Sequence, residues 1–203
     1  MGSITPNILY RSSHPIKNNK QEKIISMLAG NAKIATVINL CDTNSGIISK
    51  AFFAPWYNNI LKNDRLIALG MDFSVKSKSF RKKLKIGLDF IIHTEGPWLI
   101  HCHAGVDRTG FVSMVLESFM GASLEDVKND YLLSFNSIFE SSIYHQTQKT
   151  DSAAAMQVLS AMSDSQIINE QNLQQIAETY LRHKVGLSVD ELESLRLKLM
   201  GER

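Results

Sequence analysis

Residues 101–110 read His-Cys-His-Ala-Gly-Val-Asp-Arg-Thr-Gly, so five residues separate Cys102 from Arg108. A thiol and a guanidinium at this spacing can act as a nucleophile and as the clamp of an anionic electrophile, provided that a tight loop joins them. Residues 97–100 form an apolar run before this segment, and residues 111–120 form an apolar helical pattern after it. We therefore expect a strand, a small turn and a helix, with successive backbone N–H groups pointing into one cup. Such a cup suits a dianionic phosphoryl group.

The chemistry expected of this loop is nucleophilic attack by sulfur on phosphorus. Loop N–H groups and the helix dipole favour the thiolate form of Cys102, and the planar fork of Arg108 can bind two phosphate oxygens, which lysine cannot do. A phosphorylated cysteine would form and water would then hydrolyse it, so no metal or cofactor is needed. Thr109 either donates its hydroxyl to the sulfur or is an ordinary residue at the start of a helix. The alternative for Cys102 is a buried core thiol.

The hydrophobic pattern predicts the elements that must position this loop. Residues 34–40 are continuously apolar and rich in β-branched side chains, as in a strand buried on both faces, which favours a parallel sheet covered by helices. We expect further strands at 8–10, 66–69 and 97–101, and helices at 21–29, 79–93, 109–120, 124–133, 163–182 and 188–200. The prediction is an α/β fold with a central, mostly parallel sheet flanked by helices. Functional residues of such sheets follow the strand C-termini.

Residues 1–203 are expected to form one domain, in which the mostly helical part 136–203 can cover the site. Residues 136–152 are rich in Ser, Thr, Gln and Asn and are predicted to be a mobile loop within it. The hydrophobic content of 44% is enough for a sizeable core, whereas a net charge of +2 is too balanced for a dedicated nucleic-acid binder. The two cysteines and the lack of zinc-type spacing indicate a reducing setting without a structural metal. The chain given shows neither a membrane-spanning run nor a signal peptide, which favours a cytoplasmic protein or a secreted effector.

The segment His-Cys-x-x-Gly-x-x-Arg-Thr-Gly resembles the signature of the cysteine-dependent protein tyrosine phosphatase superfamily. Residues 10–13, 36–40, 79–110 and 180–199 extend the resemblance to the bacterial tyrosine phosphatases, some of which also hydrolyse phosphoinositides. This resemblance implies a phosphomonoester hydrolase. Phosphotyrosine proteins rank first among its expected substrates, and dual specificity is a further expectation. Phosphoinositides or inositol phosphates are the alternative substrates. A non-catalytic phosphate-binding protein and a sulfur-transfer or arsenate-reducing enzyme are further alternatives.

A leaving oxygen needs a proton from a nearby carboxylic acid, and two aspartates compete for this role. Asp72 follows a predicted strand about thirty residues before Cys102, where the superfamily usually carries its mobile acid loop. Asp107 immediately precedes Arg108, as in the relatives that act on lipids and proteins. Asp64 is a third candidate. Those relatives often have lysine where this chain has Val106, which weakens the expectation of a preference for highly phosphorylated inositides.

The remaining loop residues are expected to bind substrate or to support the loop. Ala104, Gly105 and Val106 line the cup with their backbone, and His103 either tunes specificity or is merely exposed. His101 is expected to hydrogen-bond to the backbone of the loop, and Arg11 either pairs with Asp107 or is exposed. The resemblance to certain lipid phosphatases suggests Cys41 as a resolving thiol for Cys102, although a small buried residue explains it equally well.

A basic cluster follows Asp72 and allows two interpretations. It is either a solvated helix face or an electrostatic rim that attracts acidic phosphopeptides or anionic membrane headgroups toward the cup. The cluster consists of Lys76, Lys78, Arg81, Lys82, Lys83 and Lys85.

Overall fold

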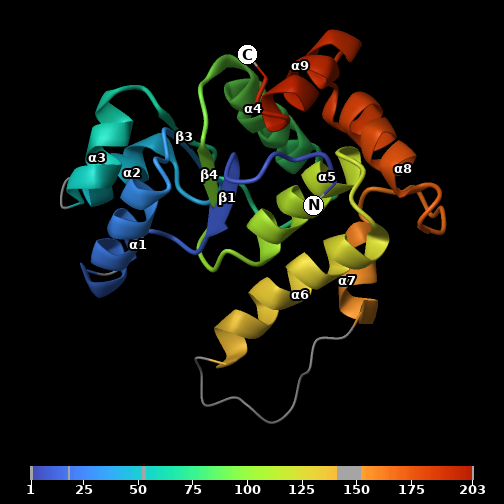
Figure 1. The fold of residues 1–203 in the computed structure, drawn as a ribbon, viewed down its shortest axis with the longest axis horizontal. Helices are drawn as coiled ribbons and strands as arrows, with labels where there is room; N and C mark the ends of the chain where they lie inside the picture. Colours follow the sequence, from blue (N-terminus) through green and yellow to red (C-terminus); the bar gives the residue numbers. More distant parts are fainter. Residues whose placement is uncertain (1, 18, 52–53, 141–151, 203) are drawn as a thin grey trace.

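Four parallel strands in the order β1-β4-β2-β3 form the centre of the molecule in this computed structural model (Figure 1). The structure describes residues 2–17, 19–51, 54–140 and 152–202, with the backbone alone for 19–21 and 137–140. The strands are β1 (Leu9–Ser12), β2 (Thr36–Asn39), β3 (Leu66–Ala68) and β4 (Trp98–His101). Ser12 and Asn39 both pair with His101, so three strands end level with one another. The predicted α/β fold with a parallel sheet is confirmed.

Helices cover both faces of the sheet (Figure 1). One face packs against α1 (Asn19–Asn31), α2 (Asn44–Ala51) and α3 (Pro55–Lys62), and the other against α4 (Lys78–His93) and α5 (Asp107–Phe119). Alternate strand residues serve the two layers, since Val37 lies in the first core and Ile38 in the second. Every residue of β2 and β4 is buried, as the continuous apolar run predicts.

The helix α5 is buried on all sides, with every residue from Arg108 to Phe119 shielded from solvent. The remaining helices pack around α5 and α4, so they support the helix that follows the nucleophile loop. They are α6 (Leu124–Glu140), α7 (Ser152–Leu159), α8 (Leu173–Thr179), the π-helix η1 (Tyr180–Val185) and α9 (Val189–Leu199). None of the helices in the described part of the chain is long and apolar enough to cross a membrane.

Two predicted boundaries in the C-terminal half are wrong. The helix α6 continues to Glu140, through part of the predicted loop 136–152, whereas residues 141–151 of that loop lie outside the described residues. The helix expected from residue 163 begins only at Leu173. Before it, the Asn169 and Asn172 side chains accept hydrogen bonds from each other's backbone N–H groups, and this local bonding competes with a helix.

Candidate active site

The nucleophile loop joins the end of β4 to the start of α5 and encloses the sulfur of Cys102. Cys102 is 1% exposed, and the Gly105 N–H donates a hydrogen bond to its Sγ at 3.2 Å. Gly105 has φ +81°, and a Cβ at this position would lie 2.7 Å from the Ser12 backbone. Only glycine fits this turn, because a side chain would be strained in the left-handed region and would collide with the end of β1.

Arg108 lies in the first turn of α5 and is 5% exposed. One guanidinium nitrogen donates to the Met71 carbonyl at 2.8 Å, and its Cζ lies 4.3 Å from the centroid of the Phe73 ring. Its Nε is buried and has no hydrogen-bond partner in the described part of the chain. An anion in the loop would satisfy this donor.

Of the two aspartates expected to supply a proton, Asp72 lies between two residues that contact Arg108, and Asp107 precedes Arg108 in the chain. Asp72 is exposed between Met71 and Phe73, and its Oδ1 accepts a hydrogen bond from the Ser74 N–H at 2.8 Å. Asp107 is exposed as the first residue of α5. Asp64, in contrast, precedes β3 and so lies at the amino edge of the sheet, whereas the nucleophile loop lies at the carboxyl edge. This placement excludes Asp64 as the acid.

A chain of hydrogen bonds runs beneath the loop. The Nδ1 of His101 lies 3.3 Å from the Cys102 carbonyl, its Nε2 lies 2.8 Å from the Tyr57 hydroxyl, and Asn39 donates to that hydroxyl at 3.0 Å. Burial and, next, the charge of His14 lower the pKa of His101 to about 3. His101 is therefore neutral at physiological pH and can donate to the loop carbonyl while it accepts from tyrosine.

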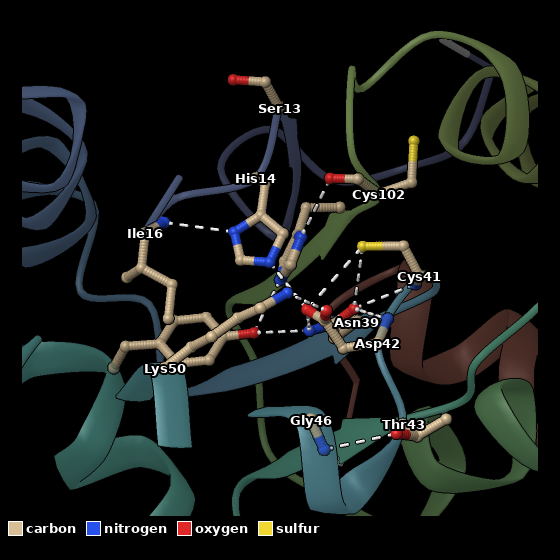
Figure 2. A network of polar contacts seen from close by, with 12 residues as sticks. Ser13, His14, Ile16, Asn39, Cys41, Asp42, Thr43, Gly46, Lys50 and Cys102 are labelled. Carbon is tan, nitrogen blue, oxygen red and sulfur yellow. Dashed lines mark hydrogen bonds and ion pairs between the residues drawn. The ribbon is translucent and has the colours of Figure 1, made fainter. Parts of the chain in front are cut away.

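A second network follows the ends of β1 and β2 and converges on Asp42 (Figure 2). Its Oδ2 accepts from His14 Nε2 at 2.7 Å and from Asn39 at 2.9 Å, and its Oδ1 accepts from Lys50 at 2.5 Å. Burial favours the neutral carboxyl, but these three donors outweigh it and lower the pKa of Asp42. Asp42 is thus a fixed negative charge and no proton donor. The backbone N–H of His14 also donates to the His103 carbonyl at 3.2 Å, which connects this network to the nucleophile loop.

Cys41 lies beside this network (Figure 2) and donates from its thiol to Asn39 Oδ1 at 3.3 Å. Burial and the charge of Asp42 raise the pKa of Cys41 to about 12, and the charge of Cys102 is among the smaller causes. The two thiols are near enough for their charges to interact, and both are reduced. Cys41 therefore stays protonated at physiological pH.

Arg11 supports the loop, but its expected ion pair with Asp107 is not formed. It pairs instead with Asp130 of α6, and it donates to the Gly105 carbonyl at 3.2 Å. Arg11 thus ties the nucleophile loop to α6. Asp107 lies near Tyr131, since its charge contributes, after burial, to raising the pKa of that tyrosine.

Glu117 extends the Arg11–Asp130 pair into the core. It is 3% exposed within α5 and forms a hydrogen bond with Asp130. Burial and the negative charge of Asp130 raise the pKa of Glu117 to about 8. A protonated Glu117 donates to Asp130, and Asp130 can then remain ionised for Arg11.

The other predicted loop residues differ in exposure. His103 is exposed. Its pKa is lowered, first by partial desolvation and then by the positive charges of Lys17, His14, Arg108 and Lys50. Val106 is buried in the core, so it can face a ligand only through its backbone. Thr109 is fully buried, and its hydroxyl lacks a hydrogen-bond partner among the described residues, so the expected bond to Cys102 is not formed here.

The basic cluster does not form a single free rim. Lys83 donates to the Gly70 carbonyl at 2.5 Å, and Lys85 donates to the Gly186 carbonyl at 2.6 Å and pairs with Glu191 at 3.2 Å. These two side chains therefore connect parts of the fold. Lys76, Lys78 and Lys82 are exposed.

The loop, its buried cysteine and its arginine on a parallel sheet define the class of cysteine-dependent phosphatases. The chain belongs to the tyrosine phosphatase family, whose model matches residues 52–201, and the family prediction from the sequence is confirmed. This membership supports phosphatase activity. A comparison with curated proteins gives no match.

The family match begins after β2, so it contains both candidate acids and the whole nucleophile loop. Arg11, His14 and Asp42 precede the matched range. Sequence reasoning did not single out His14, Asp42, Tyr57, Glu117 or Asp130 as site residues. The positions of His14 and Asp42, two and three residues after the ends of β1 and β2, are the signal that could have identified two of them.

Proposed function

We propose that this phosphatase hydrolyses phosphomonoesters through a phosphorylated Cys102. The observation that carries the proposal is the burial of the Cys102 sulfur against the Gly105 N–H, in the loop that leads directly to Arg108 in the first turn of α5. Sulfur attacks phosphorus, the phosphorus–oxygen ester bond breaks, and an acid protonates the departing oxygen. Water then attacks phosphorus, the phosphorus–sulfur bond breaks, and the same carboxylate accepts the water proton.

The loop supplies charge stabilisation for both steps. Arg108 binds two phosphoryl oxygens after it leaves the Met71 carbonyl, and the backbone N–H groups of the loop bind the others. Thr109 supplies a hydroxyl donor to the departing sulfur in the second step. Its hydroxyl is buried without a partner in the described structure and is therefore available for this bond.

Asp72 is the proposed general acid, and Asp107 is the alternative. Asp72 lies between the two residues that contact Arg108, so substrate binding to Arg108 would move the acid loop with it. Asp107 is adjacent to Arg108 in the chain and needs no loop movement. Both carboxylates are exposed, as a group that must reach a substrate oxygen requires.

Phosphotyrosine proteins are the proposed substrates. Phe73 is 68% exposed next to Arg108, so an aromatic ring on the substrate could pack against it while its phosphate reaches the loop. Phosphoinositides are the second candidate, because Lys17, Lys50 and Arg108 all lie near enough to His103 to lower its pKa. Further phosphates on an inositol ring would meet positive charge there.

The proposal is tested with pH–rate profiles on an aryl phosphate and on a phosphoserine peptide, whose alkoxide leaving group needs protonation. Cys102→Ser should abolish turnover of both. The aspartate that is the acid should, when changed to Asn, lose the alkaline limb of the profile and slow the phosphoserine peptide more than the aryl phosphate. A parent protein that binds vanadate without turnover would instead be a non-catalytic phosphate-binding protein. Parallel assays with phosphotyrosine peptides and phosphoinositide vesicles rank the substrates.

Cys41 is a proposed resolving thiol. Peroxide would oxidise Cys102 to a sulfenic acid, and attack by Cys41 would form a disulfide and release water. Because the pKa of Cys41 is raised to about 12, disulfide formation should accelerate with rising pH. Mass spectrometry of the peroxide-treated parent and of Cys41→Ser checks this, and a Cys102 that overoxidises equally in both proteins makes Cys41 a structural residue.

A further inference from the structure

A cavity of about 500 Å³ lies between the start of α4 and the segment that follows α7. Lys76 and Arg81 form one side of it, residues 160–166 form the opposite side, and Tyr180 and Lys184 of η1 complete the wall. None of these residues contributes to the nucleophile loop. Three of the side chains are cationic and one, Asp164, is anionic.

The charges around this cavity are not balanced within the fold. Lys184 is paired with Asp164 at 2.6 Å. Lys76 makes neither a hydrogen bond nor an ion pair with any residue that the structure describes, and Arg81 uses only its Nε, on the Ser77 carbonyl at 3.3 Å. The ammonium of Lys76 and the two terminal nitrogens of Arg81 are thus left as donors.

A third donor is buried in the wall. Tyr180 is 2% exposed, and its hydroxyl has no hydrogen-bond partner among the residues described. A buried hydroxyl without a partner is costly, so its retention calls for an explanation. Burial raises the pKa of Tyr180 and outweighs the opposing charge of Arg81, so the hydroxyl stays protonated and can act as a donor.

We propose that this cavity is a second anion site, which binds a phosphomonoester group through Lys76, Arg81 and Tyr180. Lysine, a guanidinium fork and a hydroxyl are the donors that phosphate oxygens accept. The paired Asp164 leaves the site with a net positive charge.

The site is close enough to the nucleophile loop to act on the same substrate. Lys76 is three residues from Phe73, whose ring contacts Arg108, and three residues span at most about 11 Å. This inference rests on the proposed function and extends it. The preferred substrate is a protein segment with two phosphorylated residues, one in each site.

The test compares kcat/KM for a phosphotyrosine peptide and for the same peptide with a second phosphorylated residue a few positions away. The parent should prefer the doubly phosphorylated peptide by about tenfold, the worth of one charge-assisted hydrogen bond. Lys76→Gln/Arg81→Gln should reduce this ratio to about one without changing turnover of the singly phosphorylated peptide. Lys78→Gln/Lys82→Gln, which removes the same charge from exposed positions nearby, should keep the ratio. An unchanged ratio in the first variant, or an equal loss in the second, overturns the proposal.

A binding measurement separates this proposal from the proposed function. Calorimetric titration with inorganic phosphate should show two sites on the parent and one on Lys76→Gln/Arg81→Gln, whether or not the protein turns over any substrate. Tyr180→Phe should weaken the second site several-fold without loss of thermal stability, because its hydroxyl has no partner to lose. One phosphate site on the parent overturns the proposal. An inositol phosphate that shows the same ratio and the same loss would make a small phosphorylated ring, rather than a peptide, the source of the second phosphate.

Discussion

Glu117 stays protonated in the folded protein at pH values at which a free glutamate is ionised. Its pKa in the folded protein is about 8, above the ordinary value of 4.5, so the folded state keeps a proton that the unfolded state loses. Its contribution to stability is therefore fully present below pH 4.5 and declines as the pH rises toward 8. Glu117→Gln keeps a donor for Asp130 and cannot ionise. We expect this variant to be more stable than the parent at pH 8 by on the order of 4 kcal/mol, with little difference at pH 5.

Urea unfolding at pH 5 and pH 8 measures this effect. Glu125→Gln, an exposed position on α6, is the matched control and should follow the parent at both values. Equal pH dependence in Glu117→Gln and the parent would show that Glu117 is ionised in the folded protein.

Arg108 allows a prediction on activity at the same scale. Arg108→Lys keeps the positive charge but loses the fork and the contact with the Phe73 ring. We expect kcat to fall by about 10³-fold, as for loss of a transition-state donor, while the thermal unfolding temperature changes little. Steady-state kinetics with calorimetry on the same samples decides the matter, and near-parental kcat would remove Arg108 from the proposed mechanism.

The sequence predicted the local residues of the site and missed its distant partners. Cys102, Arg108 and Gly105 lie in one short segment, so their spacing reveals the loop directly. Asp130 is 119 residues from Arg11, and no local pattern connects them. Asp107 is the acid that the loop itself offers to Arg11, but Arg11 pairs with Asp130 of α6 instead.

At the scale of the elements, the nucleophile loop depends on close contact with the end of β1. Gly105→Ala would place a Cβ 2.7 Å from the Ser12 backbone at φ +81°, and we expect a loss of several kcal/mol or displacement of the loop. Gly30→Ala in α1 is the control, because a Cβ there meets no atom within 4 Å. It should leave stability unchanged or raise it by about 0.5 kcal/mol. Chemical denaturation and phosphate affinity report on both variants, and parental phosphate binding by Gly105→Ala would contradict the argument.

Elements with a strong hydrophobic period were predictable, and those shaped by local polar bonding were not. The sheet strands and α4 follow the apolar pattern, because burial determines both their length and which of their side chains face the core. The start of α8 is set by hydrogen bonds between Asn169 and Asn172, which the apolar period cannot reveal. The change from α8 to the π-helix η1 departs from the 3.6-residue period, and no feature of the composition indicates it.

At the scale of the whole molecule, the C-terminal helices pack against the helices that carry the site. The helix α9 contacts α4 and η1, and α8 contacts α5, so residues far from the nucleophile loop complete its core. This packing predicts that residues 1–203 unfold as one unit. Leu195 of α9 is fully buried, and Leu195→Ala should cost about 2–5 kcal/mol in a single unfolding transition. The KM of the folded fraction should not change, because α9 contacts α4 and η1 and supplies no residue to the nucleophile loop.

Val189→Ala is the matched control for this final prediction, because Val189 belongs to the same helix and is 59% exposed. It should unfold with the parent. Far-ultraviolet circular dichroism and tryptophan fluorescence should report the same midpoint for Leu195→Ala, since Trp56 and Trp98 lie in the N-terminal half and the signal from helices includes α9. If the fluorescence midpoint stays at the parental value while the helical signal is lost earlier, the C-terminal helices fold as a separate unit, and the site does not depend on them.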